Sequence, residues 1–248
     1  MGKRAGLGDN LYVGAYDLSG DTGSASGGGG PAPMPVTGID KSAHERIGGV
    51  KDGRLEWQAW FNATAGRAHP VLSTLPRTDV IATYAFGTTL GAQAASMVAK
   101  QVNYDPTRAQ DGTLTLGVSC QSNGYGLDMG RLLTAGQRTD TAATNGSSVD
   151  HAASSAHGLQ AFLHVFAFTG TDATVKIQES SDDGATDAWA DVTGGSFTQV
   201  TGATSERIQT ARGLTVERYL RVVTTTSAGF TELVFAVAVA KNTVAVTF

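Results

Sequence analysis

Apolar and polar residues alternate with a period of two along most of the chain, a pattern typical of half-buried β-strands. The strand predicted over residues 55–62 places apolar side chains on one face, namely Leu55, Trp57, Ala59 and Phe61. Its other face is mostly polar and carries Glu56, Gln58, Trp60 and Asn62. The same alternation predicts strands over residues 80–86, 93–104 and 113–121. The first half of the chain is therefore predicted to be a β domain.

Turns and helices in this half follow from shorter signals. The pairs Asp52-Gly53, Asp111-Gly112 and Asn123-Gly124 predict tight turns beside these strands. Helical periodicity is limited to short stretches at 67–75 and 128–133. The strand at 93–104 has no strongly apolar face, which suits a sheet with both faces occupied.

The second half of the chain carries another set of alternating strands. The first begins near residue 160, and glycine-containing turns such as Asp183-Gly184 and Gly194-Gly195 separate those that follow. Short strands with regular turns predict an antiparallel sandwich over residues 160–248. The apolar residues expected in its core are Phe162, Phe166, Val175, Ile177, Leu220, Val222, Phe235 and Val237.

Two segments lack any apolar period and set the predicted domain boundaries. Residues 18–35 are rich in Gly, Ser and Pro, and predict a flexible loop. Such a loop, held at both ends, is either a contact element or a plain insertion. Residues 134–159 are small and polar, and predict a linker. The expected organisation is a domain at 1–133, a linker at 134–159 and a second domain at 160–248.

The composition agrees with an all-β fold and excludes several classes of function. Of 248 residues, 32 are Gly and only 16% are charged, which disfavours a helical bundle. A net charge of -4 offers no basic surface for clamping nucleic acid. The longest apolar run, Leu233–Ala240, is too short to cross a bilayer, and the first ten residues lack the apolar core of a signal peptide. We expect a protein made in a cytoplasm, with no membrane partner.

No catalytic or cofactor motif is found in the sequence. There is no phosphate-binding glycine loop and no nucleophile elbow, and His151 and His157 do not have the spacing of metal ligands. The single cysteine, Cys120, lies on an apolar strand face and is interpreted as a small buried hydrophobe. We therefore predict no cofactor, no metal and no enzymatic activity.

Two tryptophans leave alternatives open. Trp60, on a polar strand face, either packs against a neighbouring chain or covers a loop of its own chain. Trp189, with Asp187 and Asp191 nearby in sequence, either caps the sandwich or contributes to a carbohydrate site.

The chain resembles the major tail proteins of long-tailed phages that infect actinobacteria. The resemblance rests on the N-terminal strand with its loop, on the segment VAKQVNYDPTRAQDGTLTLGVSCQSNGYGLDMGRLLTAG and on the opening of the second domain, AFLHVFAFTGTDATVKIQESSDD. It implies a tail tube subunit with a β-sandwich or β-barrel tube domain. Such subunits form hexameric rings that stack into a tube and conduct DNA.

The resemblance also assigns roles to particular residues. It implies that the loop stacks rings, with contact candidates Ser24, Gly27, Gly30, Pro31 and Pro33. Candidates for subunit contacts or for the lumen wall are Glu56, Gln58, Trp60, Asn62, Lys100 and Gln101. The partners would be copies of the chain, other virion proteins and genomic DNA that passes without specific binding. The subunit would be assembled in the host cytoplasm and reside in the virion tail, with its second domain decorating the tube.

A binding protein is the alternative function. In this hypothesis the second sandwich recognises carbohydrate through Trp189 and Asp187, and the first domain is an oligomerising scaffold. An enzyme is a weaker third hypothesis, because no acid and base are paired in the sequence.

Overall fold

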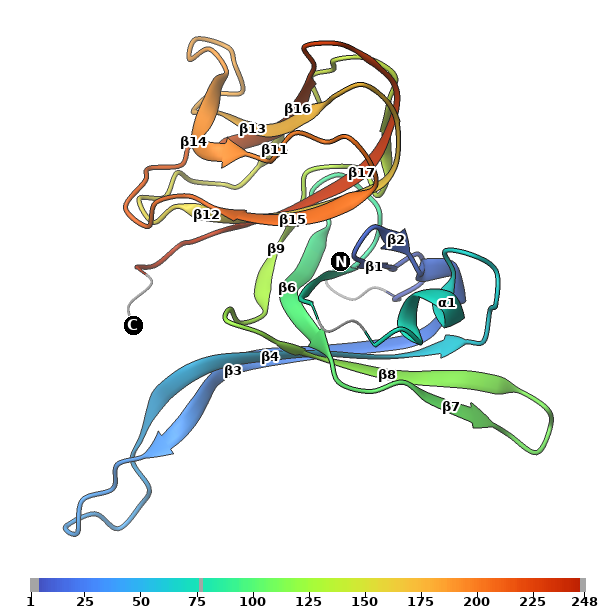
Figure 1. Cartoon of the computed structure of the whole chain (residues 1–248). Helices are drawn as coiled ribbons and strands as arrows, with labels where there is room; N and C mark the ends of the chain where they lie inside the picture. Colours follow the sequence, from blue (N-terminus) through green and yellow to red (C-terminus); the bar gives the residue numbers. More distant parts are fainter. Residues whose placement is uncertain (1–4, 76–77, 246–248) are drawn as a thin grey trace. The chain divides into compact units, whose positions relative to one another are not determined.

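The computed structural model describes residues 5–75 and 78–245, and its fold is all-β, as the sequence predicts. Residues 1–4 and 246–248, at the outer ends of the two predicted domains, lie outside this description. Among the described residues the only α-helix is α1 (Ala68–Leu72). The chain forms two compact units (Figure 1). The first contains residues 5–20, 81–96 and 129–245, and the second contains the described residues between 21 and 80 and residues 97–128.

The first unit contains the predicted antiparallel sandwich. One of its layers has the strand order β15 (Thr204–Gln209), β12 (Leu159–Gly170), β17 (Phe230–Lys241) and β9 (Asp128–Leu132). The other layer has the order β11 (Val149–Asp150), β16 (Tyr219–Thr225), β13 (Thr174–Ser180) and β14 (Ala190–Ser196). Alternate residues of both layers interdigitate in one core, and these include Leu163, Val165, Val175, Ile177, Leu220, Val222, Phe235 and Val237.

The predicted core of the sandwich is correct in most positions. Phe162 is buried, but it lies outside the shared core, because it faces away from Leu163 and Val165 on β12. Phe166 is only half-buried and contacts the ring of Tyr12, with 5.1 Å between centroids. Strand β12 therefore has apolar side chains on both faces.

The remaining strands of the first unit pair around β1 (Asn10–Val13). This strand pairs with β2 (Tyr16–Asp17) and with β5 (Val80–Ala85), which confirms the strand predicted at 80–86. Strand β6 (Gln93–Gln101) follows, and its residues 94–99 are buried on both faces, as the sequence predicts. The stretch at 128–133 is wrongly predicted as helical, since it forms β9 and pairs with β17.

A buried histidine connects three strands, β12, β5 and β6, to the turn between β1 and β2. His164 of β12 lies 2.7 Å from the carbonyl oxygen of Gly14 through Nδ1, and 2.9 Å from Thr83 Oγ1 through Nε2. Because a carbonyl only accepts, Nδ1 carries the proton and Nε2 accepts from the Thr83 hydroxyl. Thr83 Oγ1 in turn lies 2.9 Å from Ser96 Oγ, so this hydroxyl of β6 completes the chain of hydrogen bonds. Burial lowers the pKa of His164 to about 4, while the Gly14 carbonyl opposes this shift.

We predict that His164 makes the free energy of unfolding fall in acid. Its pKa is about 4 when folded and about 6.5 when unfolded, so the unfolded chain binds the proton first. The contribution of His164 to the free energy of unfolding is fully present above pH 6.5. It is lost as the pH falls towards 4, and the total loss is about 3 kcal/mol. Chemical denaturation at pH 7 and pH 4 should show that loss reduced in His164→Gln. An equal loss in both proteins would contradict the assignment.

The second unit is a twisted sheet of order β3 (Thr22–Pro35), β4 (Arg46–Trp60), β8 (Leu114–Ser122) and β7 (Asp105–Arg108). The end of β6 also pairs with β8, between Ala99–Gln101 and Ser122–Cys120. One face is buried and carries Leu55, Trp57, Ala59, Leu116, Val118 and Cys120. Cys120 is therefore a buried hydrophobe, as predicted. The helical turn predicted at 67–75 is confirmed as α1.

The loop predicted at 18–35 is the clearest error of the sequence analysis. A short 3-10 turn at Ser19–Asp21 is followed by the 14-residue strand β3, which pairs with β4 from Thr22↔Ala59 to Pro35↔Arg46. Strand β4 also begins earlier than predicted, so Asp52-Gly53 lies inside it and is not a turn. The backbone hydrogen bonds of a long hairpin order a sequence that has little strand propensity of its own.

Residues 134–159, predicted to be a linker, instead contain two short strands. Strand β10 (Arg138–Asp140) pairs with β17, and β11 pairs with β16 in the other layer of the sandwich. This segment therefore crosses from one layer to the other.

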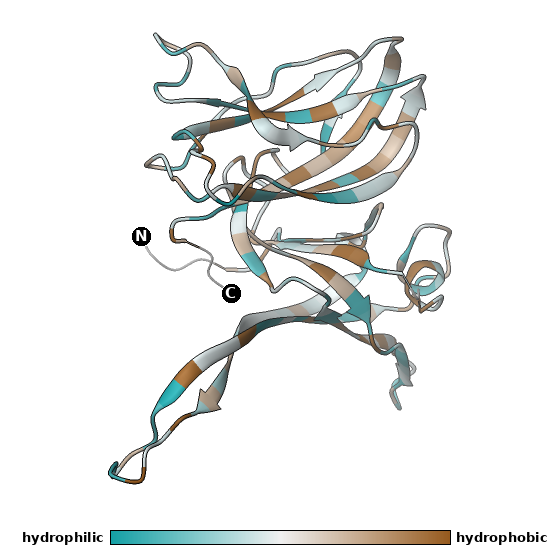
Figure 2. Ribbon diagram, turned by 60° about the vertical axis from the view of Figure 1, so that its left-hand side comes forward, coloured by the Kyte–Doolittle hydropathy of each residue, from teal (hydrophilic) through white to brown (hydrophobic). Residues whose placement is uncertain are grey.

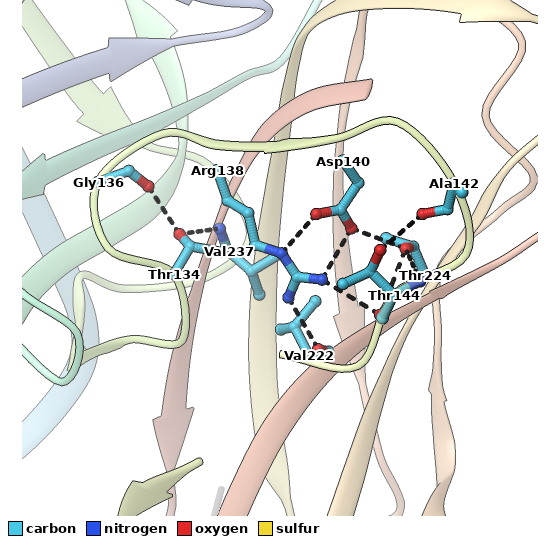
Figure 3. A network of polar contacts seen from close by, with 9 residues as sticks. All are labelled: Thr134, Gly136, Arg138, Asp140, Ala142, Thr144, Val222, Thr224 and Val237. Carbon is cyan, nitrogen blue, oxygen red and sulfur yellow. Dashed lines mark hydrogen bonds and ion pairs between the residues drawn. The ribbon is translucent and has the colours of Figure 1, made fainter. Parts of the chain in front are cut away.

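A buried ion pair holds the crossing segment in place (Figure 3). Arg138 Nε and Nη2 donate to the two carboxylate oxygens of Asp140, at 2.7 and 2.8 Å. Arg138 also donates to the carbonyl oxygens of Val222 and Thr144, while Asp140 accepts from the hydroxyl of Thr224. The pair thereby links β10 of one layer to β16 of the other.

Candidate assembly surfaces

The outer part of the β3–β4 hairpin is an exposed two-stranded arm. Among the residues that the structure describes, this hairpin arm, residues 31–51, pairs only within itself, because β4 pairs with β8 only between Arg54 and Trp60. It carries large apolar side chains that are 48% to fully exposed, namely Met34, Val36, Ile39, Ile47 and Val50. Figure 2 shows brown, hydrophobic bands along the outer part of this hairpin. Exposed apolar side chains gathered on one projecting element are typical of a contact surface.

The base of the arm needs residues without side chains. Gly29 and Gly53 are directly opposite each other in the hairpin. A Cβ on Gly29 would lie 2.9 Å from Leu127 Cβ, and one on Gly53 would lie 2.6 Å from the Leu127 backbone nitrogen. The glycine run that suggested a flexible loop therefore includes a position where Leu127 packs closely across the hairpin.

The outer edge of β3 changes character along its length. Among the described strands β3 pairs only with β4, so its other edge offers backbone groups for a further strand. Residues 22–30 contain no proline, and they include the predicted contact residues Ser24, Gly27 and Gly30. Pro31 and Pro33 lie in the hairpin arm, where the missing N–H groups disfavour pairing with another strand. The predicted stacking residues therefore fall into two groups. Ser24, Gly27 and Gly30 lie on an edge that can pair with a further strand, whereas Pro31 and Pro33 lie in the arm, where such pairing is disfavoured.

Part of the second predicted set shares one exposed face of the sheet. Glu56, Gln58 and Trp60 project from the polar face of β4, and the Trp60 ring is 52% exposed. Its indole lies close to Gly23, since a Cβ there would be 3.4 Å from Trp60 Nε1. Lys100 lies opposite Gln121 on the same face.

The remaining members of that set have contacts within the subunit. Lys100 Nζ lies 2.7 Å from Asp79 Oδ1, and hydrogen bonds from Lys100 and Asn123 lower the pKa of Asp79. Asn62 donates to Asp21, whose other carboxylate oxygen accepts from the first residue of α1. Gln101 donates to the carbonyl oxygen of Leu72 at the end of α1. Asn62 and Gln101 therefore hold α1 against the sheet and are poor candidates for contacts between subunits.

The tryptophan considered for carbohydrate binding is already in contact with its own chain. The Arg221 guanidinium lies 4.4 Å from the centroid of the Trp189 ring, and the edge of the ring lies close to Gly184. The Asp187 carboxylate accepts from the Ser181 backbone N–H and closes the loop between β13 and β14 on itself. The geometry favours the capping interpretation of Trp189.

The apolar residues of the hairpin arm were missed by the sequence analysis. Val36, Ile47 and Val50 stand among glycines and charged residues, without a period that marks a strand. Their only sequence signal is that a polar, glycine-rich region contains large apolar side chains at all.

In the part of the chain that the structure describes, no group of three or more His, Cys, Asp or Glu side chains is arranged to hold a metal ion. No helix there has the length and apolar character needed to cross a membrane.

Comparison with known proteins gives distant likenesses of fold. No family model and no curated protein matches the sequence. A chain from the virion of a native gene transfer agent particle matches 47% of this chain and 94% of its own length, with 9% identity and a TM-score of 0.39. The Dit protein of phage SPP1 matches 94% of this chain and 98% of its own, with 12% identity and a TM-score of 0.32.

A chain of the activated baseplate of phage p2 matches to a similar degree. The match covers 94% of this chain and 98% of the baseplate chain, with 9% identity and a TM-score of 0.34. All three TM-scores are below 0.5, so the case for a function rests on the residues of this chain.

Proposed function

We propose that this chain is a structural subunit of a phage tail, and that it assembles with copies of itself through the hairpin arm. The observation that carries the proposal is the arm, which pairs with no third strand among the described residues and has five exposed apolar side chains. An isolated two-stranded hairpin is marginally stable in water. Packing against a second copy would bury its apolar side chains and offset the cost of ordering them.

The finer assignment is a tail tube subunit in stacked, hexameric rings. The arm of one ring would contact the next ring, and it includes Pro31 and Pro33 of the loop at 18–35 to which the resemblance assigns stacking. The proline-free edge of β3 at residues 22–30 would pair with a strand of the neighbouring subunit within a ring. The two contacts use different residues, so a ring can close before rings stack.

The polar face of β4 is proposed to line the lumen. Its exposed side chains, Arg54, Glu56, Gln58 and Trp60, include one charge of each sign. Lys100 on the same face is paired with Asp79. A wall without excess positive charge lets DNA slide without binding. The sandwich that contains β11 to β17 is proposed to be the decorating domain of the tube.

Electron microscopy of the purified full-length protein over a range of concentrations tests the proposal. A tube subunit should give stacked rings of increasing length, and sedimentation should show mass that grows with concentration. A single closed ring that never stacks would indicate a hub subunit instead of a tube subunit. A monomer at every concentration, with no ring or tube in the micrographs, would refute assembly through the arm.

A further inference from the structure

The first unit contains a cavity of about 560 Å3 whose charged lining residues are all basic. Its walls come from β9, from the end of β17 and from the connection between β11 and β12. Arg131 and Lys241 provide two cations, and His151 and His157 provide two imidazoles. Among the described residues that line this cavity, none is acidic. Its volume lies within the range of pockets that hold small molecules.

The cationic side chains lie on neighbouring strands. Arg131 on β9 lies directly opposite Val239 on β17, and Lys241 is two residues further along β17. The Lys241 ammonium donates to the carbonyl oxygens of Ala153 and Glu217, which fixes it beside the connection between β11 and β12. The guanidinium of Arg131 has one long contact, 3.5 Å from Nη1 to the Asp150 carbonyl oxygen. Most of the donors of Arg131 thus remain available to a ligand.

His151 adds a buried polar atom without a partner. Its Nε2 is inaccessible to water and has no hydrogen-bond partner among the described residues. Burial, reinforced by the charges of Lys241 and Arg131, lowers the pKa of His151 to about 4, while Asp150 opposes the shift. Asp150 is itself paired with Arg218, and together with Glu217 and Glu179 it partly offsets the effect of burial, which lowers the pKa of Lys241. An unpaired polar atom at this depth is costly unless a ligand satisfies it.

The backbone next to His151 is strained. Ala152 has a φ of 70°, in the left-handed region that residues with a Cβ rarely adopt. Ala152 lies between His151 and Ala153, both of which line the cavity. The connection is held by paired backbone hydrogen bonds between Ser155 and Val216, at 2.7 and 2.9 Å. A strained conformation held in place in this way is typical of a binding site.

We propose that this cavity binds the phosphate group of a small phosphate ester. The Arg131 guanidinium can donate two parallel hydrogen bonds to phosphate oxygens, and the Lys241 ammonium supplies a second charge beside it. His151 contributes an imidazole to the same wall. The Ser154 hydroxyl on the rim and the unfilled volume accommodate the organic part of the ester. The site uses none of the residues of the hairpin arm, so it is independent of the proposed assembly.

Isothermal titration of the full-length protein with glycerol phosphate and, separately, with inorganic phosphate tests this site. At constant ionic strength we expect saturable binding that Arg131→Gln weakens at least about tenfold, since one charge-assisted contact contributes about 1.5 kcal/mol or more. The matched control is Arg108→Gln, which makes the same change of charge on exposed β7 and should leave the affinity unchanged. Tighter binding of the ester identifies an organic phosphate as the ligand, and tighter binding of inorganic phosphate would overturn that part of the proposal.

A second variant separates loss of binding from loss of folding. Ser154 is exposed on the cavity rim, so Ser154→Glu should fold normally, place a carboxylate beside the cations and block phosphate. Thermal denaturation checks that each variant is folded. No saturable heat with wild-type protein, or equal affinity in wild type and folded Ser154→Glu, would overturn the proposal.

Discussion

Replacing residues 32–50 by Asn-Gly is expected to abolish the stacking of rings while the subunit stays folded. Pro31 and Lys51 are directly opposite each other in the hairpin, so a two-residue turn joins them without changing the register. The deletion removes all five exposed apolar side chains of the arm. It leaves the pairing of β4 with β8 intact, because that pairing begins at Arg54. Stacked assemblies should disappear in sedimentation and leave single rings, whereas the melting temperature of the subunit should change little.

Point variants give the same test with less change to the chain. Val50→Ser removes an apolar side chain that is 85% exposed, and we expect it to raise the concentration needed for assembly. The matched control is Val102→Ser, since Val102 is also an exposed valine but lies outside the arm. Tubes of normal length from the deletion variant, or equal effects of the two serine variants, would show that the arm is not the contact.

Asp140→Ala is expected to lower the free energy of unfolding of the sandwich by about 3–5 kcal/mol, the usual cost of breaking a buried ion pair. The variant leaves the guanidinium of Arg138 buried, with only 15% of its side chain exposed, and without its carboxylate partner. It also removes the acceptor of the Thr224 hydroxyl, through which the crossing segment is bonded to β16. For a chain of this size such a loss corresponds to a fall in melting temperature of about 10 °C.

The exposed pair Arg218–Asp150 provides the control for this prediction. It has the same two-pronged geometry, with contacts of 2.8 and 2.6 Å, but more than two fifths of each side chain is exposed. Asp150→Ala should therefore cost much less than Asp140→Ala, because water replaces the lost partner. The double variant Arg138→Met/Asp140→Leu should recover part of the loss, since it leaves no unpaired buried charge. Equal costs for the two single variants would mean that burial does not strengthen the Arg138–Asp140 pair.

The sequence alone was sufficient to predict the all-β fold, most strands and most of the sandwich core. Alternation with a period of two is a local property, and it identifies a strand wherever one face is buried and the other is exposed to solvent. The face of β4 that carries Leu55 and Trp57 is an example, as is the burial of Cys120 on β8. The lack of a dominant apolar face at 93–104 also predicted correctly that β6 is covered on both sides.

Pairing between distant segments was decided only by the tertiary structure. The glycine-rich residues of β3 have no period of their own, and they become a strand because β4 supplies their hydrogen-bond partners. The polar segment at 134–159 belongs to the sandwich because Arg138 bonds both to Asp140 and to the carbonyl oxygen of Val222. Val222 lies 84 residues further along the chain. The cavity likewise depends on three distant segments that bring Arg131, His151 and Lys241 together. Local side-chain patterns record burial, whereas backbone pairing and ion pairs depend on which segments meet, and that is settled only when the whole chain has folded.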